Sequence, residues 1–546
     1  MLEKRSVAPW LIAAAVLIFY GNSLLGRFTF DDSFVLNKAA IHTVGLQSAR
    51  YWFPPVYYSV SGERSYRPMC TLTYFLQGRI ERLFTGNPGQ RAPQFSPFFF
   101  KAGNLMLHFL AALLLWRLAR CWLDASAALF AALLFAVYPA TTEAVNGVGF
   151  REDLLVAVFI ESAALLYLRW CRSPRKWFPM AGSMLCFVLG ILSKENAFVF
   201  PGLLILTLAA WPTRPRSKAA WIGTVPFVLA ALAAAYLLLV LFRNRVVVPY
   251  AWLEGYDGAR WKLAGPLLAA HLRTLVFPYP LIADRTFLAA EQGTCVSPLW
   301  VTIAAGVVLL SVAVWAWRKD RGLFAALIWV VVPLAPVIGL VRLGVPVADR
   351  YCYLSCLGIG LLGGRLAALA AACGRGGRLL AILLALVIAV CGAATATRNV
   401  DWCSESALWT RTLAQNPRSV KAHENIGVLL MQEGDAGAIP HLSRACDLDP
   451  SDWRLQENLA VAYAIIGQVP KAIEIAEKAL RPDALQPSLL SNLSVMYMNK
   501  PDPSPERASA YYERSLSAGA TPDPAFEARL KAGMPSGGES TRGKGE

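Results

Sequence analysis

The sequence LLAILLALVIAVCGAATAT, residues 379–397, is followed directly by RNVDWCSESALWTRTLAQNP, residues 398–417. The first stretch has no charged residue and is long enough to cross the apolar core of a bilayer, which takes about 20 residues in a helix. The second stretch mixes charged and apolar residues, as a water-soluble helix does. The chain therefore changes solvent near residue 397, from lipid to water.

Apolar runs before this point predict about eleven membrane-spanning helices. They indicate an all-α fold, with a polytopic helix bundle over residues 1–400. The run 264–283 is not counted as a span, because the prolines in its FPYP stretch interrupt a helix. The expected spans have these approximate limits: 7–25, 98–117, 125–142, 153–169, 177–193, 196–211, 219–242, 297–317, 322–342, 351–371 and 379–397.

The charge distribution predicts the orientation of these spans. Of the 546 residues, 16% are charged, and the net charge is +16. With the N-terminus in the cytoplasm, every short inside loop is basic, as the positive-inside rule requires. This orientation puts loops 26–97 and 243–296 and the whole C-terminal region outside the cytoplasm. No motif for binding nucleic acid is present, so we attribute the positive charge to membrane topology.

The C-terminal region contains an internal repeat. Asn425-Ile426, Asn458-Leu459 and Asn492-Leu493 recur at spacings of 33 and 34 residues, which is the period of tetratricopeptide (TPR) repeats. We therefore expect a TPR α-solenoid over residues 401–525. The tail 526–546 is rich in Pro, Gly, Ser and Lys and is predicted to be disordered.

Charged residues gather at the span ends that this topology places outside. Asp31-Asp32 follows the first span, where crowding and lost hydration would raise one pKa and provide a general base. The alternative is a solvated pair that ends the helix. The other charged residues at these span ends could bind an anionic phosphate. Alternatively, they could satisfy helix ends through salt bridges. They are Arg67, Glu143, Arg151, Glu152, Asp153, Lys194, Glu195, Asp349 and Arg350.

A series of short motifs resembles the transmembrane-and-TPR-repeat O-mannosyltransferase family, which belongs to the GT-C class of glycosyltransferases. The motifs follow the family's order over nearly the whole chain, and the order is more specific than any one of them. They are FDDxxxxxN from Phe30, YRP from Tyr66, NLxLH from Asn104, LLFAVYPATTEAVNGVGFREDLL from Leu133, LSKEN from Leu192, FPYPLIAD from Phe277, DRYCYL from Asp349 and RNVDW from Arg398.

The resemblance implies a GT-C-type helix bundle that uses a polyprenyl-phosphate-linked sugar, such as mannose, as donor substrate. It implies that Asp31 is the catalytic base, with Asp32 beside it. The matched positions Arg67, Arg151, Lys194 and Arg350 are the expected donor-phosphate ligands. The expected supporting carboxylates are Glu143, Asp153 and Glu195.

The chain also departs from the family pattern. Tyr138 and Thr141 stand where the family usually has histidines. We therefore expect no bound metal and no cofactor beyond the donor. The expected reaction moves a hexose to a hydroxyl of a polypeptide on the extracytoplasmic side, and the TPR domain is expected to bind that acceptor polypeptide.

Two other functions compete with this interpretation. A lipid-carrier transporter should show two similar halves or interrupted helices at matching positions, and the sequence shows neither. A non-catalytic scaffold that displays the TPR array would not explain why charged residues gather on one side. The Ala-, Leu- and Arg-rich composition favours a bacterial inner membrane with a periplasmic TPR domain, and an endoplasmic reticulum membrane is the alternative.

Overall fold

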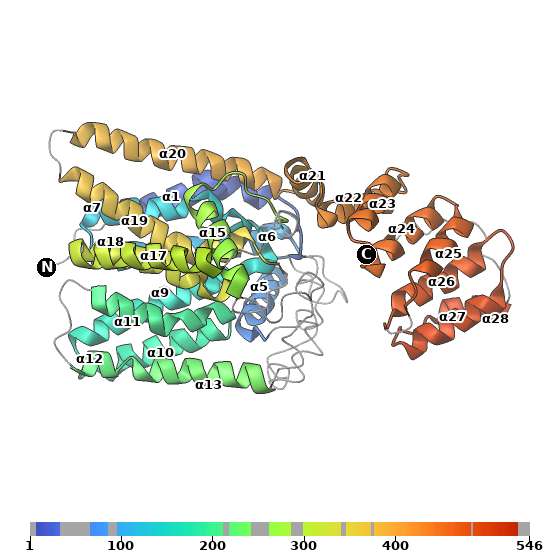
Figure 1. Cartoon of the computed structure of the whole chain (residues 1–546), viewed down its shortest axis with the longest axis horizontal. Coiled ribbons are helices and arrows are strands. Elements are labelled where there is room, and N and C mark those ends of the chain that lie inside the picture. The colour runs from blue at the N-terminus through green and yellow to red at the C-terminus, as the bar shows by residue number, and fades with distance from the viewer. Residues whose placement is uncertain are drawn as a thin grey trace. The chain divides into compact units, whose positions relative to one another are not determined.

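The computed structural model describes residues 7–32, 66–85, 95–210, 218–241, 261–285, 299–339, 345–372, 376–481 and 484–532. All regular structure within these ranges is helical (Figure 1). The predicted all-α fold is therefore confirmed. The rest of the predicted loops 26–97 and 243–296, together with residues 533–546, lies outside the described residues.

The chain divides into two compact units, Met1–Leu408 and Trp409–Glu546. The first unit thus extends a few residues beyond the end predicted for the membrane domain, residue 400. Its helices are α1 (Ala8–Tyr20), η1 (Gly21–Leu25), α5 (Pro68–Thr85), α6 (Pro97–Ala119), α7 (Ala125–Ala136), η3 (Pro139–Thr141), α8 (Thr142–Asn146), η4 (Val148–Phe150), α9 (Arg151–Arg172), α10 (Trp177–Ile191), η5 (Glu195–Val199), α11 (Phe200–Ala210), α12 (Lys218–Ile222), α13 (Val225–Leu241), α15 (Trp261–Val276), α17 (Leu299–Lys319), α18 (Arg321–Val331), η7 (Val332–Val337), η8 (Asp349–Cys352), α19 (Tyr353–Ala371) and α20 (Gly377–Asp401).

The apolar helices of the first unit make the chain a multi-pass membrane protein. Within the described residues, six helices are long and apolar enough to cross a membrane, or seven if the bent pair of α7 with η3 and α8 counts as one span. Each predicted span coincides with a helix or with helices joined end to end. The helices at the predicted spans 177–193, 196–211 and 322–342 are apolar but shorter than the six long ones. In the run 264–283, α15 ends before the two prolines.

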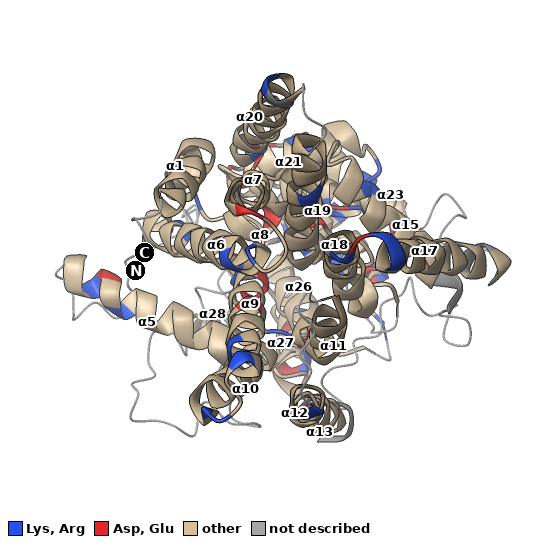
Figure 2. Cartoon of the chain, turned by 90° about the vertical axis from the view of Figure 1, so that its left-hand side faces the viewer, with Lys and Arg blue, Asp and Glu red and all other residues tan. Residues whose placement is uncertain are grey.

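Basic residues gather at one end of this bundle. Figure 2 looks at the end where α1 begins, and Lys and Arg mark the near ends of α6, α9, α10 and α20. This distribution is the one expected for cytoplasmic helix ends. The orientation itself stays a prediction.

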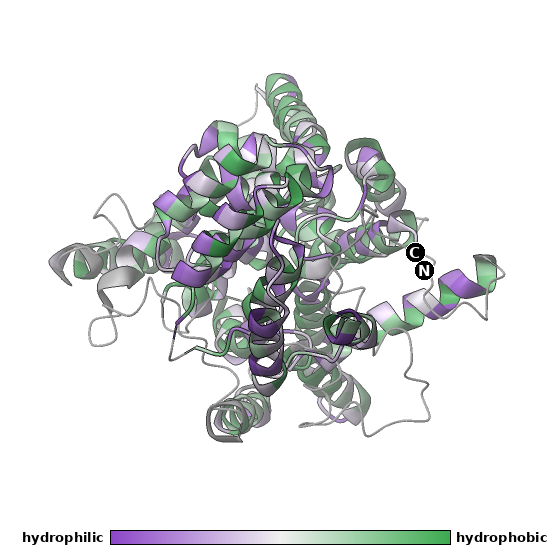
Figure 3. Cartoon of the chain, turned by 90° about the vertical axis from the view of Figure 1, so that its right-hand side faces the viewer, coloured by the Kyte–Doolittle hydropathy of each residue, from purple (hydrophilic) through white to green (hydrophobic). Residues whose placement is uncertain are grey.

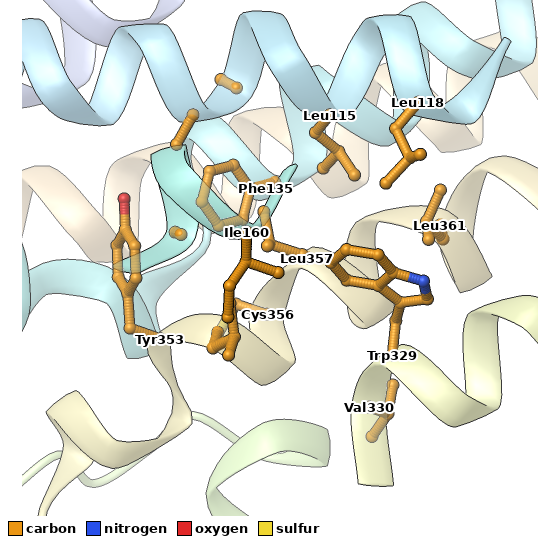
Figure 4. Packing of buried hydrophobic residues seen from close by; sticks show 14 of the residues in the cluster. Leu115, Leu118, Phe135, Ile160, Trp329, Val330, Tyr353, Cys356, Leu357 and Leu361 are labelled. Atoms are coloured by element: carbon orange, nitrogen blue, oxygen red, sulfur yellow. The ribbon is translucent and has the colours of Figure 1, made fainter. Parts of the chain in front are cut away.

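Close packing of α7 on α19 forms the centre of the bundle. A Cβ atom added at Gly360 would lie 2.6 Å from the carbonyl oxygen of Ala131, and one added at Gly364 would lie 2.7 Å from that of Ala127. The two backbones can approach this closely only because these residues have no side chain. Phe135, Trp329 and Leu357 fill the adjoining core (Figure 4), where the Trp329 Nε1–H donates to Thr207 Oγ1 at 3.1 Å.

Helices α21 (Glu405–Gln415) and α22 (Val420–Gln432) begin the C-terminal region. The helices that follow are α23 (Ala438–Leu448), α24 (Trp453–Ile465), α25 (Val469–Lys478), α26 (Pro487–Asn499), α27 (Pro505–Ser517) and α28 (Pro524–Ala532). They are coloured both purple and green in Figure 3, as expected for soluble helices with one apolar face. Helix α28 reaches into the stretch 526–546 that was predicted to be a disordered tail.

Successive helices of this region pack in pairs, α22 with α23, α24 with α25 and α26 with α27. Gly434 and Gly467, with φ of 72° and 84°, follow the first helix of two pairs. Equivalent hydrogen bonds join the first helices of neighbouring pairs, because Asn458 Nδ2 donates to Glu424 Oε1 at 3.1 Å and Asn492 Nδ2 to Glu457 Oε1 at 2.7 Å. These repeated contacts favour the TPR assignment, which stays a prediction.

The packing of α7 on α19 predicts a position-dependent effect of adding one methyl group. Gly364→Ala should lower the free energy of unfolding by about 1–3 kcal/mol, because the new Cβ meets backbone that cannot move freely. Gly306→Ala in α17 is the matched control, since no atom lies within 4 Å of its added Cβ and the gain in helix propensity is the same. Thermal unfolding in detergent would measure both, and equal melting temperatures would contradict this packing.

Candidate active site

Phe30, Asp31 and Asp32 form the turn that follows η1. Phe30 has a φ of 58°, in the left-handed region that a bulky residue rarely adopts. Its ring packs against Phe150 and Trp402, with centroid distances of 5.6 and 6.2 Å. The strained backbone is held in place by these two rings, and such strain is concentrated at functional sites. The aromatic contacts therefore fix the backbone conformation that precedes the Asp31 and Asp32 side chains.

Asp32 is fully buried and holds the turn together. Its Oδ2 accepts a hydrogen bond from the backbone N–H of Thr29 at 3.1 Å, and its Oδ1 accepts one from the N–H of Gly149 at 2.8 Å. Burial raises the pKa of Asp32 to about 7, although the nearby Lys101 ammonium opposes this change. The Asp32 carboxylate thus joins the turn to η4, and each of its oxygens accepts one backbone hydrogen bond.

Asp31, the preceding residue of the same turn, is exposed. Gly149 lies next to Asp31, since a Cβ added at Gly149 would be 3.4 Å from the Asp31 Cβ, an ordinary contact distance. Asp31 also interacts electrostatically with Arg350. Of the two adjacent carboxylates, Asp31 is the exposed one.

Five of the predicted residues, Arg67, Glu152, Asp153, Lys194 and Glu195, form one ion-pair network, called here the Lys194 cluster. Lys194 Nζ lies 2.7 and 2.6 Å from the two carboxylate oxygens of Asp153. Arg67 donates to Glu152 Oε1 and to Glu195 Oε1, both at 2.8 Å. Three carboxylates thus surround two cations, and α5, α9 and η5 are joined at their ends.

A second network, called here the Arg350 cluster, contains the predicted residues Glu143, Asp349 and Arg350. It also contains two arginines that the sequence analysis did not single out, Arg285 and Arg398. Both the guanidinium and the backbone N–H of Arg350 donate to the Glu143 carboxylate.

The two additional arginines of the Arg350 cluster act on Asp349. Arg285 Nη2 donates to Asp349 Oδ1 at 2.7 Å, and Arg398 interacts electrostatically with the same carboxylate. Arg398 also binds Asp401 at 2.8 Å. A signal was available in the sequence, because Arg398 begins the RNVDW motif and Arg285 directly follows FPYPLIAD.

The two clusters are neighbours. Lys194 Nζ lies 5.7 Å from the centroid of the Tyr351 ring, and Arg350 interacts electrostatically with Asp153. The guanidinium of Arg350 also lies over the Phe150 ring at 4.3 Å. One end of the bundle therefore brings the exposed Asp31 carboxylate together with both groups of cations.

Arg151, another of the predicted phosphate ligands, has a packing role in the structure. Arg151 is buried, its Nε donates to Asn104 Oδ1 at 2.8 Å, and its Nη2 donates to the Phe100 carbonyl at 2.9 Å. Its guanidinium also lies over the Tyr74 ring at 4.5 Å. Because Nε and Nη2 donate to buried acceptors, Arg151 braces α9 against α6, and its role as a donor-phosphate ligand stays a prediction.

The two positions where the family usually has histidine take part in packing. The Tyr138 hydroxyl donates to the carbonyl of Leu275, and Thr141 Oγ1 lies 2.6 Å from the Tyr20 hydroxyl. Within the described ranges, no three His, Cys, Asp or Glu side chains are grouped so that they could hold a metal ion.

The burial of Asp32 predicts a pH-dependent stability. Its folded pKa of about 7 lies above its ordinary value, so the folded state binds the proton more tightly than the unfolded state does. The stability gained from this proton is fully present below about pH 4 and is lost as the pH rises through about 7. Asp32→Asn keeps one oxygen, which can accept from one of the two backbone N–H groups, and it cannot ionise.

We therefore expect the melting temperature in detergent to fall less with rising pH in Asp32→Asn than in the native chain. Thermal unfolding monitored over this pH range would check the difference. Parallel pH profiles of the two proteins would contradict the assigned burial of Asp32.

Comparisons with known proteins agree with the motifs. Residues 101–242 match the family model described as dolichyl-phosphate-mannose-protein mannosyltransferase. The chain is 25% identical over 522 residues to Protein O-mannosyl-transferase TMTC3 of Homo sapiens, covering 87% of this chain and 55% of the human protein. It is 33% identical over 191 residues to Protein O-mannosyl-transferase Tmtc2 of Drosophila melanogaster, covering 33% of this chain and 19% of the fly protein.

Among solved structures, the oligosaccharyltransferase of Archaeoglobus fulgidus is similar, with a TM-score of 0.43, 15% identity, and coverage of 94% of this chain and 69% of that one. The chain spans about half the length of the two mammalian TMTC3 relatives. The resemblance to the transmembrane-and-TPR-repeat O-mannosyltransferases is thus confirmed over most of this chain.

Proposed function

We propose that this chain is a membrane glycosyltransferase that moves a hexose, such as mannose, from a polyprenyl phosphate to a protein hydroxyl on the extracytoplasmic side. The observation that carries the proposal is the exposed Asp31 carboxylate, which lies beside Arg350 at one end of a bundle of apolar helices. A base next to cations suits a reaction in which a hydroxyl is deprotonated and a phosphate leaves. The names of the relatives support the choice of mannose.

Access favours Asp31 over Asp32 as the base. The pKa of Asp32, raised to about 7 by burial, would suit a general base near neutral pH. However, Asp32 is fully buried, and each of its oxygens accepts a backbone hydrogen bond. A general base must come within hydrogen-bond reach of the acceptor hydroxyl, which Asp31 can do and Asp32 cannot without leaving its partners.

Charge and hydrogen-bond capacity favour the Arg350 cluster as the phosphate site. In the Lys194 cluster, three carboxylates already surround two cations, so an incoming anion would meet a net negative charge. With Asp401 counted beside Glu143 and Asp349, the Arg350 cluster has three arginines and three carboxylates, so it is less negative than the Lys194 cluster. Nε and Nη2 of Arg398 and Nε of Arg285 have no hydrogen-bond acceptor among the described residues, and they are enclosed by protein, so a phosphate reaches them only when neighbouring side chains move. Guanidinium groups bind phosphate oxygens strongly through such N–H groups.

The reaction then follows as a single displacement. Asp31 takes the proton of the acceptor hydroxyl while the hydroxyl oxygen bonds to the anomeric carbon. The bond from that carbon to the phosphate oxygen breaks on the opposite face, and its electron pair leaves with the polyprenyl phosphate. Arg350, Arg285 and Arg398 stabilise the charge that grows on the phosphate, and the configuration of the anomeric carbon inverts. We propose that the C-terminal repeats bind the acceptor polypeptide.

The assignment of the base predicts unequal effects at the two adjacent carboxylates. Asp31→Asn should lower the rate of transfer by ~10²–10⁴, the usual cost of removing a positioned base, and should leave the protein folded. Asp32→Asn should retain far more activity, since its amide oxygen can still accept a backbone hydrogen bond. Transfer of labelled sugar by purified protein measures both. If Asp32→Asn were inactive and Asp31→Asn near normal, the base would be Asp32.

The assignment of the phosphate site predicts a donor-specific defect. Arg398→Gln should raise the donor KM by roughly 10–100-fold, the cost of losing a hydrogen bond to a charged group, and should leave the acceptor KM unchanged. Arg378→Gln, at the exposed opposite end of the same helix α20, is the matched control and should behave as the native chain. A normal donor KM in Arg398→Gln, with a raised one in Arg67→Gln, would move the phosphate to the Lys194 cluster.

A further inference from the structure

Two histidines of the C-terminal unit face each other across its first helix pair. His423 lies on α22 and His441 on α23, and their Nδ1 atoms are 3.2 Å apart. The ring centroids are 5.3 Å apart, and the ring planes are inclined by 42°. Both side chains are partly exposed, so solvent reaches them. The other two histidines within the described residues, His108 and His271, are fully buried in the first unit.

The hydrogen bonds of His423 show where its proton lies. Its Nε2 is 3.1 Å from the carbonyl oxygen of Pro417, and a carbonyl oxygen can only accept, so Nε2 carries the proton of the neutral ring. Nδ1 of His423 therefore presents a lone pair toward His441. In metal sites, a ligating histidine commonly donates its other ring N–H to a backbone carbonyl, which fixes the tautomer and the ring orientation. His423 already has this arrangement.

The spacing of the two Nδ1 atoms suits a shared metal ion. Zinc binds imidazole nitrogens at about 2.0–2.1 Å, so two such nitrogens are about 3.4 Å apart on a tetrahedral ion and about 2.9 Å apart at a right angle. The observed separation of 3.2 Å lies between these values. Without an ion, His441 Nδ1 donates to His423 Nδ1. When an ion binds, the His441 proton moves to Nε2, and both Nδ1 lone pairs meet the ion.

The surroundings of the pair restrict the kind of ion. Imidazole suits zinc, copper and nickel, whereas magnesium and calcium prefer oxygen ligands. Arg444 interacts electrostatically with His423 and would repel a cation, but its side chain is exposed, so salt screens its charge. Within the described residues, no third His, Cys, Asp or Glu completes the site. Water must therefore supply the remaining positions, in contrast to the closed four-ligand sites of structural zinc.

We propose that His423 and His441 bind one divalent transition-metal ion of the zinc and copper class, with water in its other positions. The ion links α22 to α23 and stabilises the first helix pair of the C-terminal unit, because it binds the folded pair and not the separated helices. The expectation of no bound metal followed from Tyr138 and Thr141 in the first unit and concerned the candidate active site. The proposal for this pair does not depend on the proposed transferase activity.

Titration of the purified full chain with Zn²⁺ alone tests the pair. The protein would carry no polyhistidine tag, and isothermal titration calorimetry would compare the native chain with His441→Ala and Cys446→Ser. Cys446 is the matched control, because it also lies on α23 and is partly exposed. We expect His441→Ala to bind zinc at least about tenfold more weakly, since even the loss of an outer-shell partner costs about 10–100-fold. Cys446→Ser should bind it as the native chain does.

Copper gives an independent readout of the ligands. With Cu²⁺ in place of Zn²⁺, electron paramagnetic resonance should show coupling to two imidazole nitrogens in the native chain and to at most one in His441→Ala. Coupling to two imidazoles in both proteins would overturn the proposal.

Three calorimetric results would also overturn it: no zinc binding by the native chain, equal affinity in His441→Ala, or equal losses of affinity in His441→Ala and Cys446→Ser. If His441→Ala fails to fold, His441→Asn replaces it, because its amide can still donate to His423. A folded His441→Asn that binds zinc as tightly as the native chain would contradict the proposal in the same way.

Discussion

The pairing of Arg350 with Glu143 is the interaction on which the rest of the site depends. A buried ion without a partner costs several kcal/mol, and both residues are buried between the ends of apolar helices. Glu143 accepts hydrogen bonds from both the backbone and the guanidinium of Arg350, which places that guanidinium over the Phe150 ring. Phe150 in turn packs on Phe30, so the same pair positions the turn that carries Asp31.

Much of the fold could be predicted because the membrane imposes simple length and charge constraints. The span at 379–397 and the loss of helix at the FPYP stretch follow from apolarity and proline chemistry alone. The crosswise direction of α5 in Figure 2 could not be predicted, since its 18 residues are long enough for a short span and only tertiary contacts set their orientation. The helix α28 within the expected disordered tail was also missed, because Phe526 is buried against neighbouring helices and composition does not report such contacts.

The grouping of the candidate site residues could be predicted, but the partners of each residue could not. Sequence order and topology brought Asp31, Lys194 and Arg350 to one end of the bundle, since residues that follow or precede spans must lie at an interface. The hydrogen bonds that each cation makes within the protein depend on the residues that pack around it. Arg151 donates to Asn104 and Phe100. Nε and Nη2 of Arg398, in contrast, have no hydrogen-bond acceptor among the described residues. Such differences arise from contacts between segments far apart in the sequence, as do the opposite exposures of Asp31 and Asp32.

The central claim is that the charged end of the bundle transfers a sugar and does not merely bind or move a lipid. The most direct measurement uses the purified full chain in sealed vesicles with a labelled polyprenyl-phosphate mannose and a hydroxyl-bearing acceptor polypeptide. The account predicts that label appears in the polypeptide through a bond of inverted configuration. Label that crosses the bilayer still attached to its lipid, or that stays on the lipid at its original side, would contradict it.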